Sequence, residues 1–378
     1  MEKTQWQTFP PVLCAGMHSV DLLLINSDIP KTPESVVFFE KYTHVPGGSV
    51  YNTAKGFVLL GIPVKVLTKV GNDENGRWFI KELETLGIDT CDIRMDDSKS
   101  TCLSVLPVYH NGGRGAFSHL GTNTTIQVDD LLDDKLRQAL QNNEIDFPPY
   151  WVYHYGYPHM VTQVQGKVLA QHFQSIRSLG ITIALDMNGA NTNDERIVHS
   201  ALESVGIFHV NIEEAIALSG KHPQHLERNS NNQPLEDRVN FQQVKDIADY
   251  FHDLGVALIA ITLGPRGAFL STHSNTQILK KNIPCFPYLP KGTQVFRPNF
   301  QTMKTINGVG AGDTFTAGLL AMLIYQKQIQ SSSLSLELLA DVGLAAAMQR
   351  IDSGTQPKIL VELVQQLDKM PRSSVQPL

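Results

Sequence analysis

Cysteine is scarce in this chain: four occur among 378 residues, and no two form a C-x-x-C pair. Such scattered positions exclude a zinc-ribbon pattern or a disulfide framework, and they are typical of reduced thiols in a cytosolic protein. We therefore expect reduced thiols within the core, at Cys14, Cys91, Cys102 and Cys285.

Clusters of positive charge and long apolar runs are missing as well. The formal net charge is -6 and no long Lys/Arg tract is present, so nucleic acid and anionic membranes are poor partners. No apolar run is long enough to span a bilayer. Residues 1–11 hold neither an apolar signal core nor an Arg-rich presequence. We expect a cytoplasmic protein with no nucleic-acid or membrane partner.

The second half of the chain alternates short apolar runs with helical segments. This alternation predicts an α/β fold with a mainly parallel sheet and helices on both faces. The expected strands are Trp151–Tyr155, Thr182–Leu185, Ile207–Val210 and Ala257–Thr262. The expected helices are near Val161–Leu179, Asp194–Ser204, Glu213–Leu218 and Phe241–Leu254.

The first half predicts three strands, two helices and a hairpin around the turn at 111–113. The strands are Val12–Ala15, Leu22–Ile25 and Val64–Leu67, the helices Ser49–Leu60 and Glu74–Leu86, and the hairpin arms Thr101–Val108 and Gly115–His119. Two segments lack such a pattern. The polar tract His222–Val239 is expected to be a surface insertion, and Thr272–Thr305, with four prolines, an irregular or β-rich excursion.

A glycine-rich run at residues 307–313 reads NGVGAGD and leads directly into a strongly helical segment. A bare backbone can press its N–H groups against an anion, and the helix dipole adds positive potential there. Asp313 would repel a bound phosphate, but it could take the proton from a hydroxyl that attacks phosphorus. The alternative is a glycine-rich turn in which Asp313 merely suits the first turn of a helix.

Two common nucleotide-binding motifs do not fit. The glycines at 308, 310 and 312 lack the G-x-G-x-x-G spacing of a Rossmann fingerprint, and no G-K-[ST] of a Walker A loop occurs.

Three further segments could bind ligands. Gly47–Asn52 places two glycines before a helix and the Asn52 amide one turn inside it. This arrangement suits the binding of a sugar hydroxyl; the alternative is a tight turn. Asn211–Glu214 follows a strand and offers oxygen ligands to Mg²⁺, or else an ordinary helix cap. Thr262–Gly267 could bracket nucleotide phosphates or ribose, with Arg266 reaching toward charge, or form a β-turn.

Taken together and in this order, these segments resemble the ribokinase/PfkB family of carbohydrate kinases, from about Val12 to about Pro357. Two more blocks support the resemblance: Gly71–Gly76 with Leu83–Thr90, and Ala345–Ala347 with Gly354. It implies one ribokinase-like three-layer α/β/α domain over residues 1–378. A discontinuous β-sheet lid, at 22–48 and 100–120, would close over the sugar and exclude water. Such lids sometimes pair between subunits, so a homodimer through the lid is an option.

The resemblance also assigns roles for transfer of a phosphoryl group from ATP, with Mg²⁺, to a hydroxyl of a small sugar. Asp313 would be the catalytic base, ionised because the helix N-terminus keeps its pKa low. The transferring phosphoryl would lie in an anion hole formed by Gly310, Ala311 and Gly312. The remaining roles are sugar binding by Asp21, Gly47, Gly48 and Asn52; nucleotide binding by Asn211, Thr262, Gly264 and Gly267; Mg²⁺ binding by Asn211 and Glu214; and phosphate-side positions for Asp186 and Asn188.

One departure and several alternatives remain. The family has Asp-Thr where this chain has Asn307-Gly308, which weakens any monovalent-cation site. A nucleoside kinase, with Tyr153–Tyr157 stacking on a base, and a non-catalytic sugar-binding regulator are the competing functions. The sugar is not identified by the sequence; its specificity would depend on lid and pocket side chains such as His18, Tyr42, Ser104 and His119.

Overall fold

The computed structural model describes most of the chain. The described residues are 12–32, 34–110, 113, 115–142, 148–187, 189, 195–221, 234–301, 308–329, 335–351, 358–374 and 378. The predicted hairpin turn at 111–112, the tract 222–233, and the site residues Asn188 and Asn307 lie outside them. Within this part, no helix is long and apolar enough to cross a membrane.

An eight-stranded sheet forms the centre of the molecule, in the order β14-β13-β12-β11-β10-β9-β1-β4. Six strands run parallel, and β13 and β14 pair antiparallel at one edge. The predicted, mainly parallel sheet is therefore confirmed. The strands are β1 (Val12–Gly16), β4 (Val64–Leu67), β9 (Val152–Gly156), β10 (Thr182–Asp186), β11 (Ile207–Asn211), β12 (Leu258–Thr262), β13 (Gly267–Thr272) and β14 (Gln294–Pro298).

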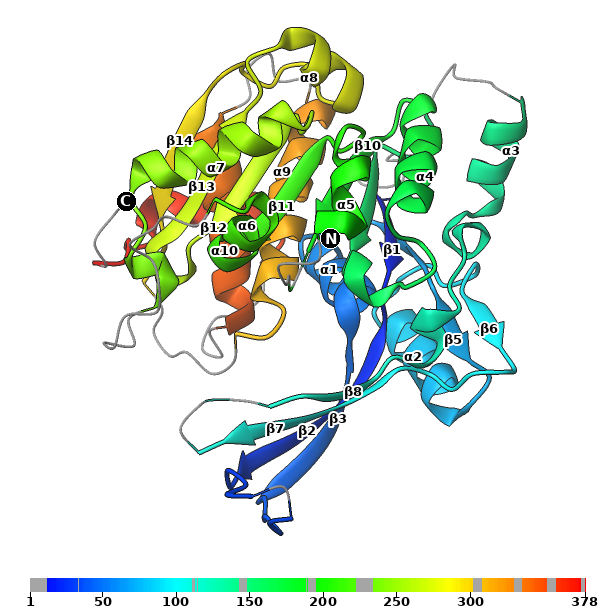
Figure 1. The fold of residues 1–378 in the computed structure, drawn as a ribbon. Helices are drawn as coiled ribbons and strands as arrows, with labels where there is room; N and C mark the ends of the chain where they lie inside the picture. The colour runs from blue at the N-terminus through cyan, green and yellow to red at the C-terminus, as the bar shows by residue number, and fades with distance from the viewer. Residues whose placement is uncertain are drawn as a thin grey trace.

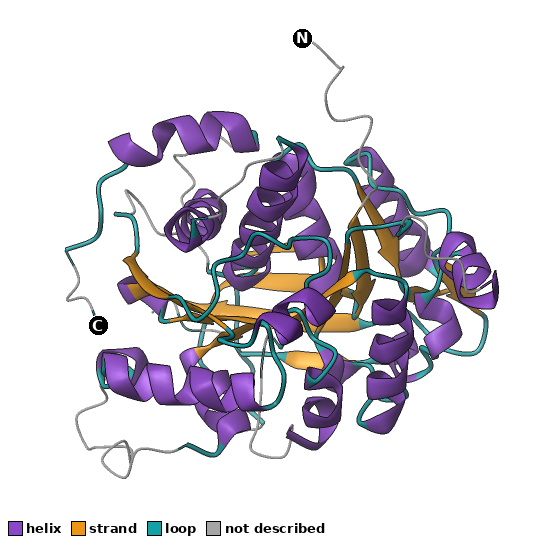
Figure 2. Cartoon of the chain, turned by 90° about the horizontal axis from the view of Figure 1, so that it is seen from above, coloured by secondary structure: helices purple, strands orange, loops and turns teal. Residues whose placement is uncertain are grey.

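Helices cover both faces of this sheet, which gives three layers (Figure 2). Alternate strand residues enter two separate apolar cores, with Val12 and Cys14 in one and Leu13 and Ala15 in the other. Burial on both faces explains the almost continuous apolar runs. The first core includes α1 (Gly48–Leu59), α2 (Glu74–Thr85), α8 (Thr276–Asn282), α9 (Ala311–Gln328), α10 (Leu336–Ile351) and α11 (Leu360–Gln366); the second includes α3 (Asp134–Asn142), α4 (Lys167–Ser178), α5 (Glu195–Leu202), α6 (Ile212–Ser219) and α7 (Phe241–Asp253).

A separate four-stranded sheet projects from the body of the molecule (Figure 1). Its order is β3-β2-β7-β8, and only β2 and β7 pair in parallel. Its strands are β2 (Ser19–Ser27), β3 (Lys41–Gly47), β7 (Leu103–Tyr109) and β8 (Phe117–His119), within the two segments assigned to the lid or next to them. A two-stranded sheet joins β5 (Lys69–Gly71) to β6 (Arg94–Asp96).

Three sequence-based expectations were wrong in detail. The helix expected from Val161 begins at Lys167, because Gly166 has a φ of 55°, outside the helical region. The excursion from Thr272 contains an unexpected helix, α8, capped by the Asn275 side chain, although the edge strand β14 agrees with its expected β content. Cys91 is exposed rather than in the core, whereas the other three cysteines are buried and all four are free.

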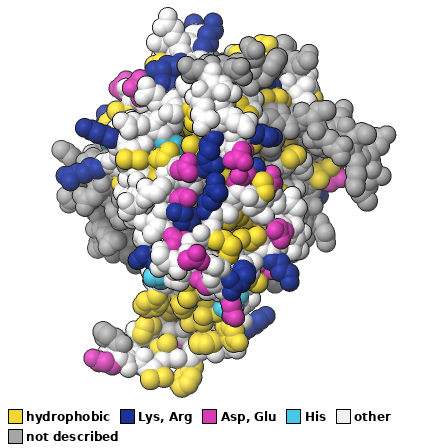
Figure 3. All heavy atoms as spheres, turned by 90° about the vertical axis from the view of Figure 1, so that its right-hand side faces the viewer, with side chains coloured by type: hydrophobic (Ala, Val, Ile, Leu, Met, Phe, Trp, Pro, Cys, Tyr) yellow, Lys and Arg dark blue, Asp and Glu magenta, His cyan; other side chains and the backbone are white. Residues whose placement is uncertain are grey.

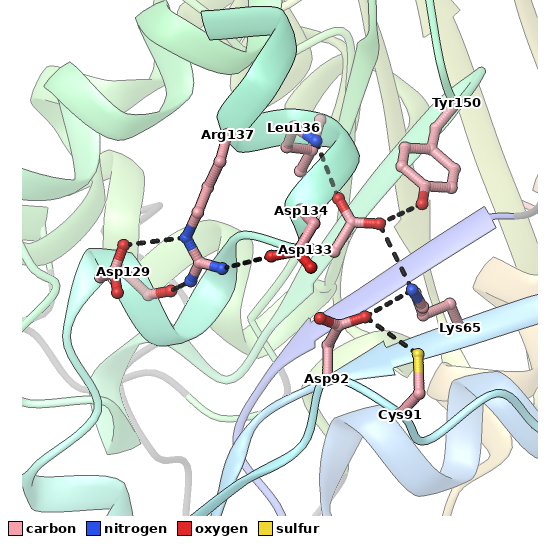
Figure 4. Close-up of polar contacts among 9 residues, drawn as sticks. All are labelled: Lys65, Cys91, Asp92, Asp129, Asp133, Asp134, Leu136, Arg137 and Tyr150. Carbon is pink, nitrogen blue, oxygen red and sulfur yellow. Dashed lines mark hydrogen bonds and ion pairs between the residues drawn. The ribbon is translucent and has the colours of Figure 1, made fainter. Parts of the chain in front are cut away.

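A charged cluster lies beneath the free edge of the main sheet (Figure 4). Lys65, on β4, is buried, and its Nζ lies 2.5 Å from Asp92, 3.4 Å from Asp133 and 3.6 Å from Asp89. The hydroxyl of Tyr150 donates a hydrogen bond to Asp133. One lysine thus pairs with several carboxylates brought together from different parts of the chain.

Candidate functional site

The N-terminus of α9 is open to a ligand because glycine precedes it. Gly310 is the N-cap residue and has a φ of 77°, a conformation that glycine adopts at little cost. A Cβ at Gly310 would lie 3.2 Å from Cγ of Asn52. The first N–H groups of a helix have no partner within the helix, which suits an anion; in this structure that of Ala311 donates a 3.1 Å hydrogen bond to the carbonyl oxygen of Gly308.

A cavity of about 450 Å³ lies against this helix end. It is lined by four of the residues that were assigned to nucleotide binding from the sequence, and by two of those assigned to the anion hole. Its apolar wall includes Phe315 and Leu344. A pocket with apolar walls and a few polar groups suits a ligand that has both a ring system and phosphates. The predicted residues that meet here are Asn211, Thr262, Gly264, Gly267, Ala311 and Gly312.

Asp313 is fully buried in the first turn of α9. The hydroxyl of Thr53 lies 3.4 Å from one carboxylate oxygen, and that of Tyr157 lies 3.3 Å from the other. Burial raises the pKa of Asp313 well above its usual value, and the nearby charge of Asp186 raises it further. The low pKa expected from the helix dipole was therefore wrong, because desolvation outweighs it.

A polar cluster near Asp313 joins Asp186 and Thr262, both assigned to the site from the sequence, to His209 and Thr316, which were not. The Nδ1 atom of His209 lies 3.0 Å from Asp186, and Thr316 donates a 2.7 Å hydrogen bond to the same carboxylate. The Nε2 atom of His209 lies 3.3 Å from the hydroxyl of Thr262 in the cavity wall. Although burial raises the pKa of Asp186, His209 lowers it on balance. The sequence signal that could have indicated this cluster was His209, a histidine inside the otherwise apolar start of β11.

The residues assigned to the sugar surround the start of α1. A Cβ at Gly47 would lie 2.1 Å from a carboxylate oxygen of Asp21, so only glycine leaves room for that carboxylate. Gly48 has a φ of 80°, and a Cβ there would lie 2.7 Å from the carbonyl oxygen of Met17. Asn52 faces Gly310. The four predicted positions thus gather around the start of α1, and Asn52 borders the start of α9.

Asn211 and Glu214 form a capping box on α6, as their simpler interpretation required. The Asn211 side chain accepts a 2.9 Å hydrogen bond from the Glu214 N–H, and Glu214 accepts one of 2.9 Å in return. Burial raises the pKa of Glu214. No group of three or more His, Cys, Asp or Glu side chains in the described part of the chain could hold a metal directly. A buried carboxylate beside an amide oxygen still fits Mg²⁺ bound through water, because hard oxygen ligands suit this ion.

Two other assignments change. The guanidinium of Arg266 does not reach toward the cavity; it is buried and bonds the carbonyl oxygens of Glu236 and Val239. Tyr153 and Tyr155 are fully buried in the core and cannot stack on a nucleobase.

His18, named above among the side chains that would set sugar specificity, is instead buried, and its ring lies 3.3 Å from the Thr68 hydroxyl, which is typical of a structural histidine. Burial lowers its pKa to about 3, so it is neutral at physiological pH.

Comparison with known proteins identifies the family. The sequence pattern of the pfkB family carbohydrate kinases matches residues 12–357. The chain belongs to this family. A ribokinase of Arabidopsis thaliana is 23% identical over 323 residues, which cover 84% of this chain and 72% of that protein.

Solved structures of pfkB-type kinases share the fold. The structure of Arabidopsis thaliana ribokinase complexed with ribose and ATP matches with a TM-score of 0.69 and 18% identity, over 95% of this chain and 99% of that one. An archaeal nucleoside kinase of the ribokinase family, from Methanocaldococcus jannaschii, matches with a TM-score of 0.63 and 15% identity, over 96% and 99%. The ribokinase-like fold predicted from the sequence is confirmed.

Proposed function

We propose that this pfkB-family kinase transfers the γ-phosphoryl group of ATP to a hydroxyl of a small sugar. One observation carries the proposal: Asp313 directly follows Ala311 and Gly312, which line the large cavity, and it contacts Thr53 of α1, next to Asn52. A carboxylate at that point can reach a hydroxyl on one side, while backbone N–H groups reach a phosphate on the other.

In this mechanism Asp313 accepts the proton of the sugar hydroxyl as the new P–O bond forms. A raised pKa makes the ionised carboxylate a stronger base. The N–H groups of Ala311 and Gly312 stabilise the charge on the transferring phosphoryl. Asp21 and Asn52 orient the sugar, and Thr262 and Gly264 bind the nucleotide. Asn211 and Glu214 would hold Mg²⁺ through its waters, and the ion supplies charge neutralisation on the phosphates.

A panel of sugars and nucleosides tests the substrate class. Each compound is assayed for ADP release with ATP and Mg²⁺, and for thermal stabilisation without ATP. The true substrate should support turnover, and at a hundred times its Kd it should stabilise the fold by about 2.7 kcal/mol. A compound that stabilises the protein without any ADP release would instead support a sugar-binding regulator.

The same panel tests the nucleoside kinase alternative. The rings of Tyr157 and His159 stack, with centroids 6.1 Å apart and planes 19° apart, and Tyr157 contacts Asp313. A nucleobase could extend this stack. ADP release with nucleosides and none with sugars would replace the sugar kinase proposal with this one.

We also propose that two copies pair through the small sheet, which would serve as a lid. Hydrophobic side chains gather on this lobe of the surface (Figure 3). Large exposed apolar groups of this kind mark interfaces. Those on or beside the sheet are Ile29, Val36, Phe38, Tyr42 and Phe117.

Light scattering after size exclusion should give twice the chain mass of 41.9 kDa for the wild type. Phe38→Lys should shift the mass toward the monomer, because Phe38 is 75% exposed on the lobe. Ile329→Lys, at an exposed apolar position at the end of α9, is the control and should not. A wild-type monomer would refute the pairing.

A further inference from the structure

A second, smaller cavity of about 190 Å³ lies between α1 and the C-terminal end of α10. It shares no lining residue with the large cavity described above. Asn52 and Thr314 lie in its wall, so it borders the catalytic centre from the α1 side. Ligand pockets for drug-sized molecules are about 300–1,000 Å³, so this cavity suits a small group rather than a whole nucleotide.

The lining of this cavity is cationic. Lys55 comes from α1, Arg350 from α10, and Lys358 from the segment that leads into α11. No Asp or Glu belongs to the lining among the residues that the structure describes. Burial lowers the pKa of Lys55, and the positive charge of Arg350 lowers it further. The two cations therefore repel each other across a space that contains no described counter-charge.

Neutral donors face the same space. The Nε2 atom of Gln349 is buried and has no hydrogen-bond partner among the described residues, although its Oε1 atom accepts a 2.7 Å hydrogen bond from the Lys358 N–H. A buried amide donor without a partner is unfavourable, and an oxygen acceptor in the cavity would satisfy it. Asn52 adds a second amide.

We infer that this cavity binds a phosphate group at a site separate from the cradle for the transferring phosphoryl. Lys55, Arg350 and the amide of Gln349 match an oxyanion, and Lys358 adds positive charge, although its ammonium already donates a hydrogen bond to Gln366. Charge-assisted hydrogen bonds are the strong ones. Arg350 provides a planar fork that suits phosphate oxygens. The overall charge of -6 makes a cationic pocket here a local feature and not a general property of the surface.

The site is adjacent to the reaction centre. The Nε atom of Arg350 would lie 3.5 Å from a Cβ at Gly310, the residue that caps α9, and Asn52 hydrogen-bonds Asp313. An anion held by Arg350 and Asn52 would thus be separated from the base, Asp313, only by the Asn52 side chain. The phosphate could be free inorganic phosphate or the phosphate of an already phosphorylated sugar, and the two share the same recognition chemistry.

Calorimetric titration with inorganic phosphate at constant ionic strength tests the site in the full-length protein. Three proteins are compared: the wild type, the double variant Lys55→Met/Lys358→Met, and the control Lys280→Met/Lys291→Met. The control removes the same charge from exposed positions on and after α8. We expect saturable binding to the wild type and the control, and at least about tenfold weaker binding to the double variant.

The double variant leaves the N–H groups of Gly310–Gly312 unchanged, so phosphate bound in that cradle would titrate alike in all three proteins. Equal affinities, or no saturable binding to the wild type, would overturn the inference. Melting curves of each protein without phosphate show that the variants are folded.

A second titration separates the two sources. A sugar and its phosphorylated form are compared on the same proteins. If the site belongs to the substrate, only the phosphorylated sugar should lose affinity, by about tenfold or more, in the double variant. If the site serves free phosphate, only inorganic phosphate should lose affinity in the double variant. Both titrations measure binding and not turnover. The phosphate site can therefore be refuted while the kinase proposal stands, and the kinase proposal can be refuted while the site stands.

Discussion

Asp313→Asn is expected to lower kcat for phosphoryl transfer by about 10²–10⁴-fold, the usual contribution of a positioned base. Asparagine keeps the size, and its Oδ1 can still accept a hydrogen bond from one of the Thr53 and Tyr157 hydroxyls, but it cannot accept the proton. KM values for both substrates should change little, since the groups proposed to bind them remain. ADP release measured with the sugar found in the panel is the assay.

The same substitution is expected to raise the melting temperature. The folded-state pKa of Asp313 is above its unfolded value, because burial and the charge of Asp186 disfavour the ionised form. The folded state therefore binds more protons, and stability falls as the pH rises through the unfolded pKa toward the folded one. Removal of the charge should thus stabilise the protein more at pH 8 than at pH 5.

Asp368→Asn is the matched control, because Asp368 is exposed and the change in net charge is identical. It should alter neither kcat nor the melting temperature appreciably. Near-normal transfer by Asp313→Asn would contradict the role of the base. An unchanged melting temperature with lost activity would leave that role intact but contradict the raised pKa.

The second large effect concerns stability. Lys65→Met is expected to lower the free energy of unfolding by about 3–5 kcal/mol, the usual loss when one partner of a buried ion pair is removed. Asp92 and Asp133 would remain as carboxylates without their cation, and the Asp133 side chain is 1% exposed. Burial alone would lower the pKa of Lys65, but these carboxylates raise it on balance, so the lysine is charged.

Urea unfolding of the wild type, Lys65→Met and Lys245→Met measures the loss in free energy of unfolding for a buried and an exposed ion pair. Lys245 lies 2.6 Å from Asp249, but the two side chains are 35% and 45% exposed, and such pairs contribute about 0.5 kcal/mol or less. Adding Asp92→Asn and Asp133→Asn to Lys65→Met should recover part of the loss, because the unpaired charges are removed. Equal losses for the two lysine variants would show that burial adds nothing to the Lys65 cluster.

Much of the fold was predictable because its signals are local. The strand Val64–Leu67 has the predicted bounds, and α1 and α7 agree within a residue at each end, since period, glycine position and side-chain caps act over a few residues. The glycine segments at 47–48 and 310–312 were recognisable for the same reason. Helix α8 was missed because it is short and directly precedes a proline-rich stretch in a segment without a clear period.

The electrostatics of the site could not be predicted in this way. The pKa of Asp313 depends on Asp186, and the cluster around it includes His209 and Thr316, which come from three separate elements. The cationic cavity likewise joins α1 to the end of α10. The sequence by itself determined the family, the sheet and the glycine cradle, because these follow from short patterns. The tertiary structure decided which charges share a buried space, because charge interactions depend on distance and desolvation, neither of which is local in the chain.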